Sequence, residues 1–183
     1  LYGRSADNLR DHRHVTALLN RVHVYENGIV NQPTLSFDER GHLANRTAYG
    51  VFAVCDRLSV ADRWPILEEF NGEGGDLFMP AIPQSDERTP HRPGAVVEGY
   101  EALGGLGFPE INLLPGERIT IVAGYFIAEG VAAVEALAAK RLSIAGFDDL
   151  LQATRDHWMR ETAAVEMHLS SAERSGGLRW VGL

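Results

Sequence analysis

The spacing of hydrophobic side chains changes at Gly130, and this change constrains the fold more than any other feature of the sequence. Before Gly130 apolar residues alternate with others, as a β-strand requires, and residues 118–127 give the clearest example. One face of that predicted, half-buried strand carries Ile119, Ile121, Ala123, Tyr125 and Ile127. After Gly130 the spacing becomes helical, which predicts helices over residues 131–142 and 147–165. The chain should therefore be mainly β, with two helices at its end.

Further strands are predicted upstream. Apolar and β-branched residues between 14 and 25 end at Glu26-Asn27-Gly28, which is typical of a hairpin turn. Residues 34–37 form another candidate strand, followed by a turn over residues 38–41. Residues 47–55 are almost continuously apolar, which predicts a central strand buried on both faces. These segments predict an antiparallel β-sandwich over residues 13–127.

Composition and charge exclude several classes of protein. The 183 residues are 45% hydrophobic and 23% charged, as in one globular domain or part of a larger one. No apolar run approaches the roughly 20 residues of a membrane-spanning helix, so no membrane partner is expected. A net charge of −8 disfavours binding to nucleic acid. The single cysteine, Cys55, allows no internal disulfide and fits a reducing compartment, which predicts a cytoplasmic location.

Two histidines near the start of the chain suggest a metal site. His12 and His14 would share one face of a strand, where both could reach the same ion. A carboxylate ligand expected four or five residues later is missing, because Leu18 and Leu19 occupy those positions. We therefore interpret Arg10, His12 and His14 as a polar rim, and we expect neither a metal nor a cofactor.

A glycine-rich segment is the main candidate binding site. Gly72, Gly74 and Gly75 would let the backbone approach a partner closely, and aromatic and polar residues surround them. Leu77 replaces the third glycine of a dinucleotide-binding loop. The predicted contacts to substrate or to another domain are Trp64, Phe70, Asn71, Gly72, Glu73, Gly74 and Asp76, with Phe78 as a further aromatic. The alternative is that the aromatic rings pack beneath the loop as core.

No catalytic residue is predicted. Glycoside hydrolysis needs two carboxylates that face each other roughly 5–10 Å apart across a sugar. The adjacent pairs Asp38-Glu39 and Glu68-Glu69 do not meet this requirement, because neighbours on a strand point to opposite faces and acids at turns are usually solvated. Asp148-Asp149 lies in the first turn of a predicted helix, where negative charge stabilises the helix.

Several motifs taken in order resemble one enzyme family. Residues 8–16 (NLRDHRHVT), 37–42 (FDERGH) and 70–75 (FNGEGG), with Pro80, resemble the N-terminal region of inverting glycoside phosphorylases. The relatives are β-1,2-oligoglucan and cellobiose phosphorylases and the phosphorylase-like part of cyclic β-glucan synthases. Residues 113–117 (LLPGE), the Ala-rich helix and the helix with Trp158 resemble the passage into their linker helices. Residues 178–181 (LRWV) resemble the approach to their catalytic barrel.

The resemblance implies a galactose-mutarotase-like β-supersandwich over residues 1–128, incomplete at its N-terminus. Residues 129–183 would be a helical linker leading to an (α/α)6 barrel, which holds the catalytic acid and the phosphate site in these families. The implied partners are a β-glucan oligosaccharide and inorganic phosphate, the barrel of the same chain, and a second copy in a homodimer. The chain itself would then be a non-catalytic domain of a carbohydrate-active enzyme that transfers glucosyl units between β-glucan and phosphate.

Two other interpretations stay open at this point. The chain is alternatively a free-standing carbohydrate-binding or protein-interaction β-sandwich module. A third hypothesis is a small metal-dependent enzyme built around His12 and His14. The first residue is not Met and the last residues, 180–183, are mostly apolar, so we expect a piece of a longer chain.

Overall fold

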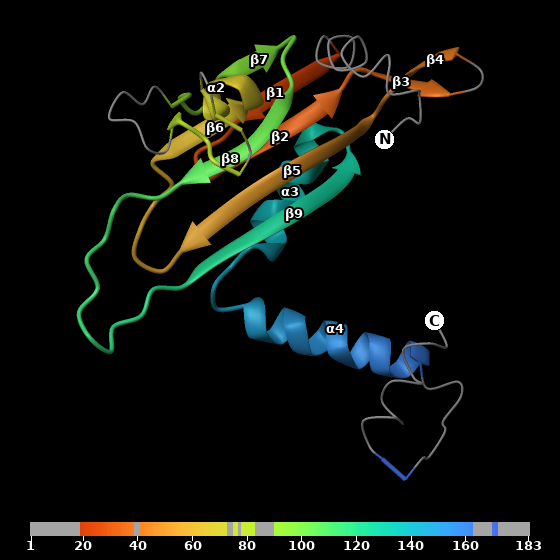
Figure 1. Cartoon of the computed structure of the whole chain (residues 1–183). Helices are drawn as coiled ribbons and strands as arrows, with labels where there is room; N and C mark the ends of the chain where they lie inside the picture. Colours follow the sequence, from red (N-terminus) through yellow and green to blue (C-terminus); the bar gives the residue numbers. More distant parts are fainter. Residues whose placement is uncertain are drawn as a thin grey trace. The chain divides into compact units, whose positions relative to one another are not determined.

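The protein is mainly β, with antiparallel sheets and few helices (Figure 1). The structure is a computed structural model, and it describes residues 19–38, 41–72, 75–76, 78–82, 90–162 and 170–171. The chain divides into two compact units, Leu1–Ile144 and Ala145–Leu183. The last described strand, β9, ends at Glu129 and only helices follow it among the described elements, so the switch from strands to helices at Gly130 is confirmed.

The largest sheet has five strands in the order β7-β1-β2-β5-β9, and every neighbouring pair is antiparallel. Its strands are β1 (Asn20–Val24), β2 (Gly28–Pro33), β5 (Thr47–Cys55), β7 (Val96–Glu98) and β9 (Ile121–Glu129). The predicted hairpin turn joins β1 to β2, where the Tyr25 N–H donates to the Gly28 carbonyl at 2.8 Å. Strand β5 has the predicted bounds.

Two small sheets and three helices complete the described part. The small sheets pair β3 (Leu35–Asp38) with β4 (Gly41–Ala44), and β6 (Asp62–Ile66) with β8 (Ala102–Gly107). The helices are α2 (Leu67–Asn71), α3 (Val131–Arg141) and α4 (Phe147–Glu161). Both helices predicted after Gly130 are present as α3 and α4. The predicted start of the sandwich at Arg13 and the last residues of the second predicted helix lie outside the described residues.

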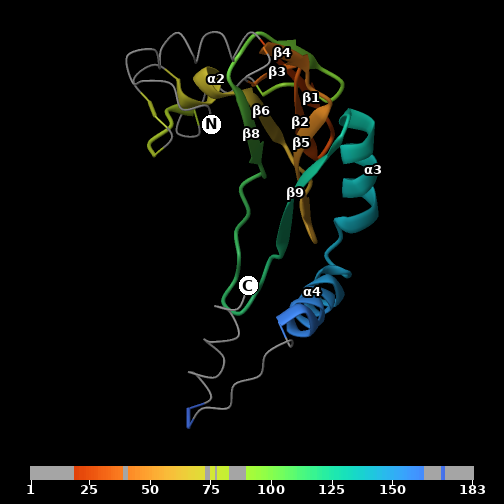
Figure 2. The same ribbon diagram turned by 90° about the vertical axis from the view of Figure 1, so that its right-hand side faces the viewer.

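The large sheet separates two layers (Figure 2). Helix α3 packs on one face and contacts β2, β5 and β9, while β6 and β8 lie on the opposite face and contact β1 and β2. Side-chain alternation explains this arrangement: β2 offers Ile29 on one face and Val30 on the other, whereas the apolar residues of β1, Val22 and Val24, lie on the face away from α3. The core beneath α3 contains Val30, Ala48, Phe52, Val134 and Ala138. On the opposite face Val22, Val24 and Ile29 are buried, as are Trp64 and Ile66 of β6.

Two glycines let the core beneath α3 close tightly. Gly28 lies directly opposite Phe52 in the sheet, and a Cβ atom at Gly28 would collide with the Phe52 ring. A Cβ atom at Gly50 would lie 2.6 Å from a methyl carbon of Val134 in α3. Glycine at these positions therefore makes room for the ring and for the helix, at the cost of some strand propensity.

The exposure of β5 and β9 differs from the sequence prediction. Burial of β5 on both faces is wrong, because Tyr49 is exposed and Val51 is only partly buried. In β9 the strand was predicted to be half-buried through its apolar face with Tyr125 and Ile127, but both of these side chains are exposed. The opposite face contributes Phe126 and Ala128 to the core, because α3 begins two residues after β9 and packs on that side.

Helix α4 belongs to the second unit, Ala145–Leu183. Its apolar residues lie on one stripe, as the helical spacing predicts. Trp158, Leu150 and Met159 on α4 are nevertheless exposed, and within the described part of this unit no other element covers them.

The core can be tested with two matched phenylalanine substitutions. Phe52 is 3% exposed and packs beneath α3, whereas Phe78 is 93% exposed. We expect Phe52→Ala to lower the free energy of unfolding in urea by about 3–5 kcal/mol, through lost burial and the cavity that remains. Phe78→Ala should change it by less than about 0.5 kcal/mol. Equal effects of the two substitutions would contradict the described core.

Candidate functional site

The predicted glycine-rich site lies around the end of α2. Phe70 and Asn71 are the last residues of α2, and Gly72 follows with a φ of 67°, in the left-handed region that favours glycine. Its N–H donates to the Glu68 carbonyl at 2.9 Å and closes the helix. The structure therefore brings Phe70, Asn71 and Gly72 together at one helix end.

Two other predicted contacts have structural roles. Trp64 is 5% exposed in β6, so its ring is buried, as the core alternative proposed. The Asp76 Oδ1 atom accepts the N–H groups of Phe78 and Met79, both at 2.8 Å, and so closes a turn.

The remaining predicted site residues lie outside the described residues. Glu73 and Gly74 of the glycine-rich segment are among them, as are Arg10, His12 and His14 of the proposed polar rim. Their roles stay predictions. Within the part of the chain that is described, no three histidine, cysteine or acidic residues lie close enough to hold a metal ion. A search of the same residues for a helix long and apolar enough to cross a membrane finds none.

A polar pair that the sequence did not suggest joins α2 to the segment before β7. The His91 Nε2 atom is 2.7 Å from the Glu69 Oε2 atom, and both side chains are partly exposed. The His91 backbone N–H donates to the Arg63 carbonyl at 3.0 Å, which fixes this segment beside β6. The two partners are 22 residues apart, so no local motif reveals the pair.

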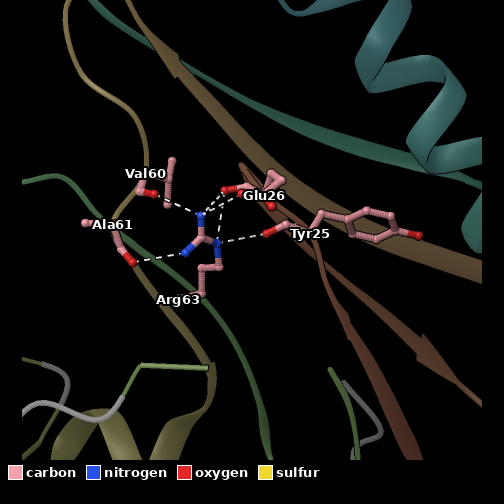
Figure 3. Close-up of polar contacts among 5 residues, drawn as sticks. All are labelled: Tyr25, Glu26, Val60, Ala61 and Arg63. Atoms are coloured by element: carbon pink, nitrogen blue, oxygen red, sulfur yellow. Dashed lines mark hydrogen bonds and ion pairs between the residues drawn. The ribbon is translucent and has the colours of Figure 1, made fainter. Parts of the chain in front are cut away.

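Among the described residues, the side chain of Arg63 in β6 makes the most extensive set of hydrogen bonds (Figure 3). Its Nε atom donates to the carbonyls of Tyr25 and Glu26 at 2.9 and 3.0 Å. Its Nη1 atom donates to Ala61 at 3.0 Å, and its Nη2 atom donates to Val60 at 2.9 Å and also to Glu26. Arg63 therefore links β6 to the turn between β1 and β2.

The Arg63 side chain makes these hydrogen bonds while it is almost completely removed from solvent. Arg63 is 7% exposed, and the carboxylate that faces it, on Glu26, lies at 3.5 Å on a largely exposed side chain. A guanidinium has five N–H donors in a planar fork, which suits several carbonyls at once. Sequence reasoning missed this residue, because its Tyr25 and Glu26 partners are backbone atoms 37 and 38 positions away.

A small pocket lies between the same turn and α3. Its volume is about 260 Å³, below the roughly 300 Å³ at which ligand pockets usually begin. The lining is Tyr25, Glu26, Asn27, Phe52, Glu135, Ala138, Ala139 and Leu142. Burial raises the pKa of Tyr25 above its ordinary value, and the negative charge of Glu135 together with its hydrogen bond to the tyrosine adds to this effect. The pocket thus has an apolar floor and an acidic rim.

A broad apolar surface that no described element of the first unit covers lies on β5 and β9, on the side of the sheet opposite α3. We call it the outer face, and its residues are Tyr49, Val51, Ile121, Ala123, Tyr125 and Ile127. Tyr49 lies directly opposite Ile127 in the sheet, and Val51 lies opposite Tyr125. Tyr125 is 86% exposed and Ile127 is 63% exposed. A contiguous apolar patch of this kind usually marks an interaction surface.

Comparison with protein-family models gives no match for this chain, and comparison with curated proteins gives none either.

The contribution of Arg63 can be measured against a second arginine in the same sheet region. Arg63→Met should lower the free energy of unfolding by at least about 3 kcal/mol, because it leaves the buried Val60 carbonyl and the partly buried carbonyls of Tyr25 and Glu26 without these donors. Arg21→Met removes an exposed ion pair to Glu98 and should cost less than about 1 kcal/mol. Urea denaturation of both variants gives the comparison. A cost for Arg63→Met no larger than for Arg21→Met would show that the carbonyls do not depend on the guanidinium.

The raised pKa of Tyr25 predicts a pH dependence. The folded state favours the neutral phenol, so this residue's contribution to stability is complete below its ordinary pKa of about 10. The contribution is lost as the pH rises through the higher folded-state pKa. The free energy of unfolding of the wild type should therefore fall more steeply above pH 10 than that of Tyr25→Phe. Parallel curves for the two proteins would contradict the prediction.

Proposed function

We propose that the chain is a non-catalytic β-sandwich domain of a carbohydrate-active enzyme. In this proposal it is a galactose-mutarotase-like sandwich, and α3 and α4 are the linker helices that follow it. The antiparallel sheets and the two helices occur in the order that the resemblance to inverting glycoside phosphorylases implies. The enzyme would transfer glucosyl units between a β-glucan and phosphate on an (α/α)6 barrel.

The observation that carries the proposal is the uncovered outer face. A domain that functions alone would ordinarily bury residues such as Tyr125 and Ile127, since each large apolar side chain gains roughly 1.5–3 kcal/mol on burial. Their exposure on a regular nine-residue strand is typical of a surface that packs against another domain. The outer face would be the part of this domain that docks on the rest of the enzyme.

The arrangement of the layers supports the same role. Sheet β6–β8 covers β1 and β2 and contacts β5 near Val51, where Gly104 approaches that side chain closely. The outer face begins at this border and continues the buried layer across β5 and β9. A domain packed on the outer face would therefore extend an existing core, and the rigid sheet would hold it in one orientation.

A carbohydrate-binding module is the second candidate, and one observation favours it. Tyr49 and Tyr125 are both exposed on the outer face. They lie on adjacent strands as diagonal neighbours, because Tyr125 is opposite Val51, two residues after Tyr49. Tyrosine rings present apolar surfaces with polar edges that can stack on sugars. The neighbouring isoleucines at 121 and 127 suit a protein partner better, because they offer no hydrogen bond to a sugar.

The proposal requires that the reading frame continues into a helical barrel, and it is tested in that enzyme. In that enzyme Ile127→Glu should lower phosphate-dependent release of glucose 1-phosphate from β-glucan oligosaccharides by about tenfold or more, because a buried charge disrupts docking. Val96→Glu, which changes an exposed apolar residue of β7 at the other edge of the sheet, should leave the rate unchanged. Circular dichroism of both variants checks that they fold.

Three outcomes would overturn the proposal. The first is glucose 1-phosphate release by the 183-residue chain alone, which would make the chain itself catalytic. The second is a reading frame that encodes no barrel. The third is saturable binding of β-glucan oligosaccharides to the chain that is lost in Tyr125→Ala, and this outcome would support the carbohydrate-binding module instead.

A further inference from the structure

The two edge strands of the five-stranded sheet differ: β7 has features that prevent pairing with another strand, and β9 lacks them. Strand β7 forms one edge and has only three residues. Glu98 of β7 pairs with Arg21 of β1 at 2.5 Å, so charged groups flank this edge. Short length and charge are two of the features by which proteins prevent edge strands from pairing with other chains.

Strand β9 forms the other edge and has none of these features. It has nine residues, its register with β5 runs without a bulge from Ile121 to Glu129, and it contains neither proline nor lysine. Its single charged residue is Glu129, at the last position. Among the described residues β9 pairs only with β5, so one row of its backbone groups faces away from the sheet. Such an edge is a template for a further strand.

The sequence of β9 indicates which strand fits. Residues 121–127 read IVAGYFI, and they are apolar in both directions from Gly124. If two antiparallel copies of β9 pair about Gly124, Ile121 of one copy lies opposite Ile127 of the other. Val122 then lies opposite Phe126, and the small Ala123 lies opposite the large Tyr125. Glu129 falls outside these seven paired residues, so no charge is placed in the seam.

We propose that β9 pairs with β9 of a second copy of this chain, across a two-fold axis at Gly124. The contact is isologous, so it closes at a dimer and joins the two five-stranded sheets into one. Directly opposite residues share a face, so the outer faces of the two copies become continuous. The dimer therefore uses the strand edge and leaves the outer face available for the docking described above.

Sedimentation equilibrium of the full chain tests the association. From about 1 to about 100 µM, a range that detects a micromolar Kd, the mass should shift from monomer to dimer. Ala123→Lys places a charge at the centre of the proposed seam and should raise the dissociation constant at least tenfold. The control Val96→Lys places the same charge on the exposed β7 edge and should leave the constant unchanged.

Disulfide trapping tests the register. All proteins carry Cys55→Ser, because the native cysteine lies on the same face of the neighbouring strand. Oxidation of a mixture of Ala123→Cys and Tyr125→Cys chains should give a cross-linked heterodimer, since directly opposite Cβ atoms lie roughly 4.5–5.5 Å apart. Either variant alone should cross-link poorly, because its cysteines would be diagonal neighbours roughly 7–8 Å apart.

The outcomes that overturn the proposal are distinct from those that overturn the proposed function. A monomer at every concentration, oligomers that grow beyond the dimer, or equal weakening by Ala123→Lys and Val96→Lys would each exclude pairing through β9. Cross-linking of either single variant as efficient as that of the mixture would exclude the register about Gly124. None of these measurements depends on carbohydrate, phosphate or a catalytic barrel.

Discussion

Four backbone carbonyls from two segments of the chain converge on the guanidinium of Arg63. Two of them belong to the turn between β1 and β2, and the other two precede β6. A carbonyl that is shielded from water and loses its donor costs free energy, so the arginine stabilises these two segments against each other. Through this contact the large sheet and the β6–β8 sheet are fixed to each other at one end.

The consequence of that fixed arrangement is an unequal covering of the large sheet. Helix α3 follows β9 directly and covers one face of β2, β5 and β9. The β6–β8 sheet is held over β1 and β2, so it reaches only the near side of β5. The outer face and the edge of β9 are what this arrangement leaves uncovered. The two proposals use these surfaces separately, the face for another domain and the edge for a second copy.

Local patterns in the sequence predicted the elements well. Residues 47–55 were predicted as one strand and form β5, and the change of spacing at Gly130 located α3 and α4. The Glu26-Asn27-Gly28 turn was also predicted correctly, because asparagine and glycine favour the backbone angles of a tight hairpin. These features are determined by residues that are close together in the chain, and such local patterns can be recognised in a single sequence.

The long-range features could not be predicted in the same way. Both faces of β9 are apolar, with Tyr125 and Ile127 on one and Phe126 on the other, so alternation alone does not say which face α3 covers. Arg63 binds carbonyls, and carbonyls are present at every residue, so no motif marks its partners. Trp64 was placed in the candidate site because it lies close in sequence to the glycine-rich segment, but its strand position buries it.

The central claim is that β9 ends the sheet as an open edge, and amide hydrogen exchange measured residue by residue is the most direct test. At low protein concentration the amides of β9 that point away from β5 should exchange rapidly, and their exchange should slow as the concentration rises. The amides of β7 at the opposite edge should exchange at the same rate throughout. Outward amides of β9 that are equally protected at every concentration would contradict the account, because the edge would then already be paired within one chain.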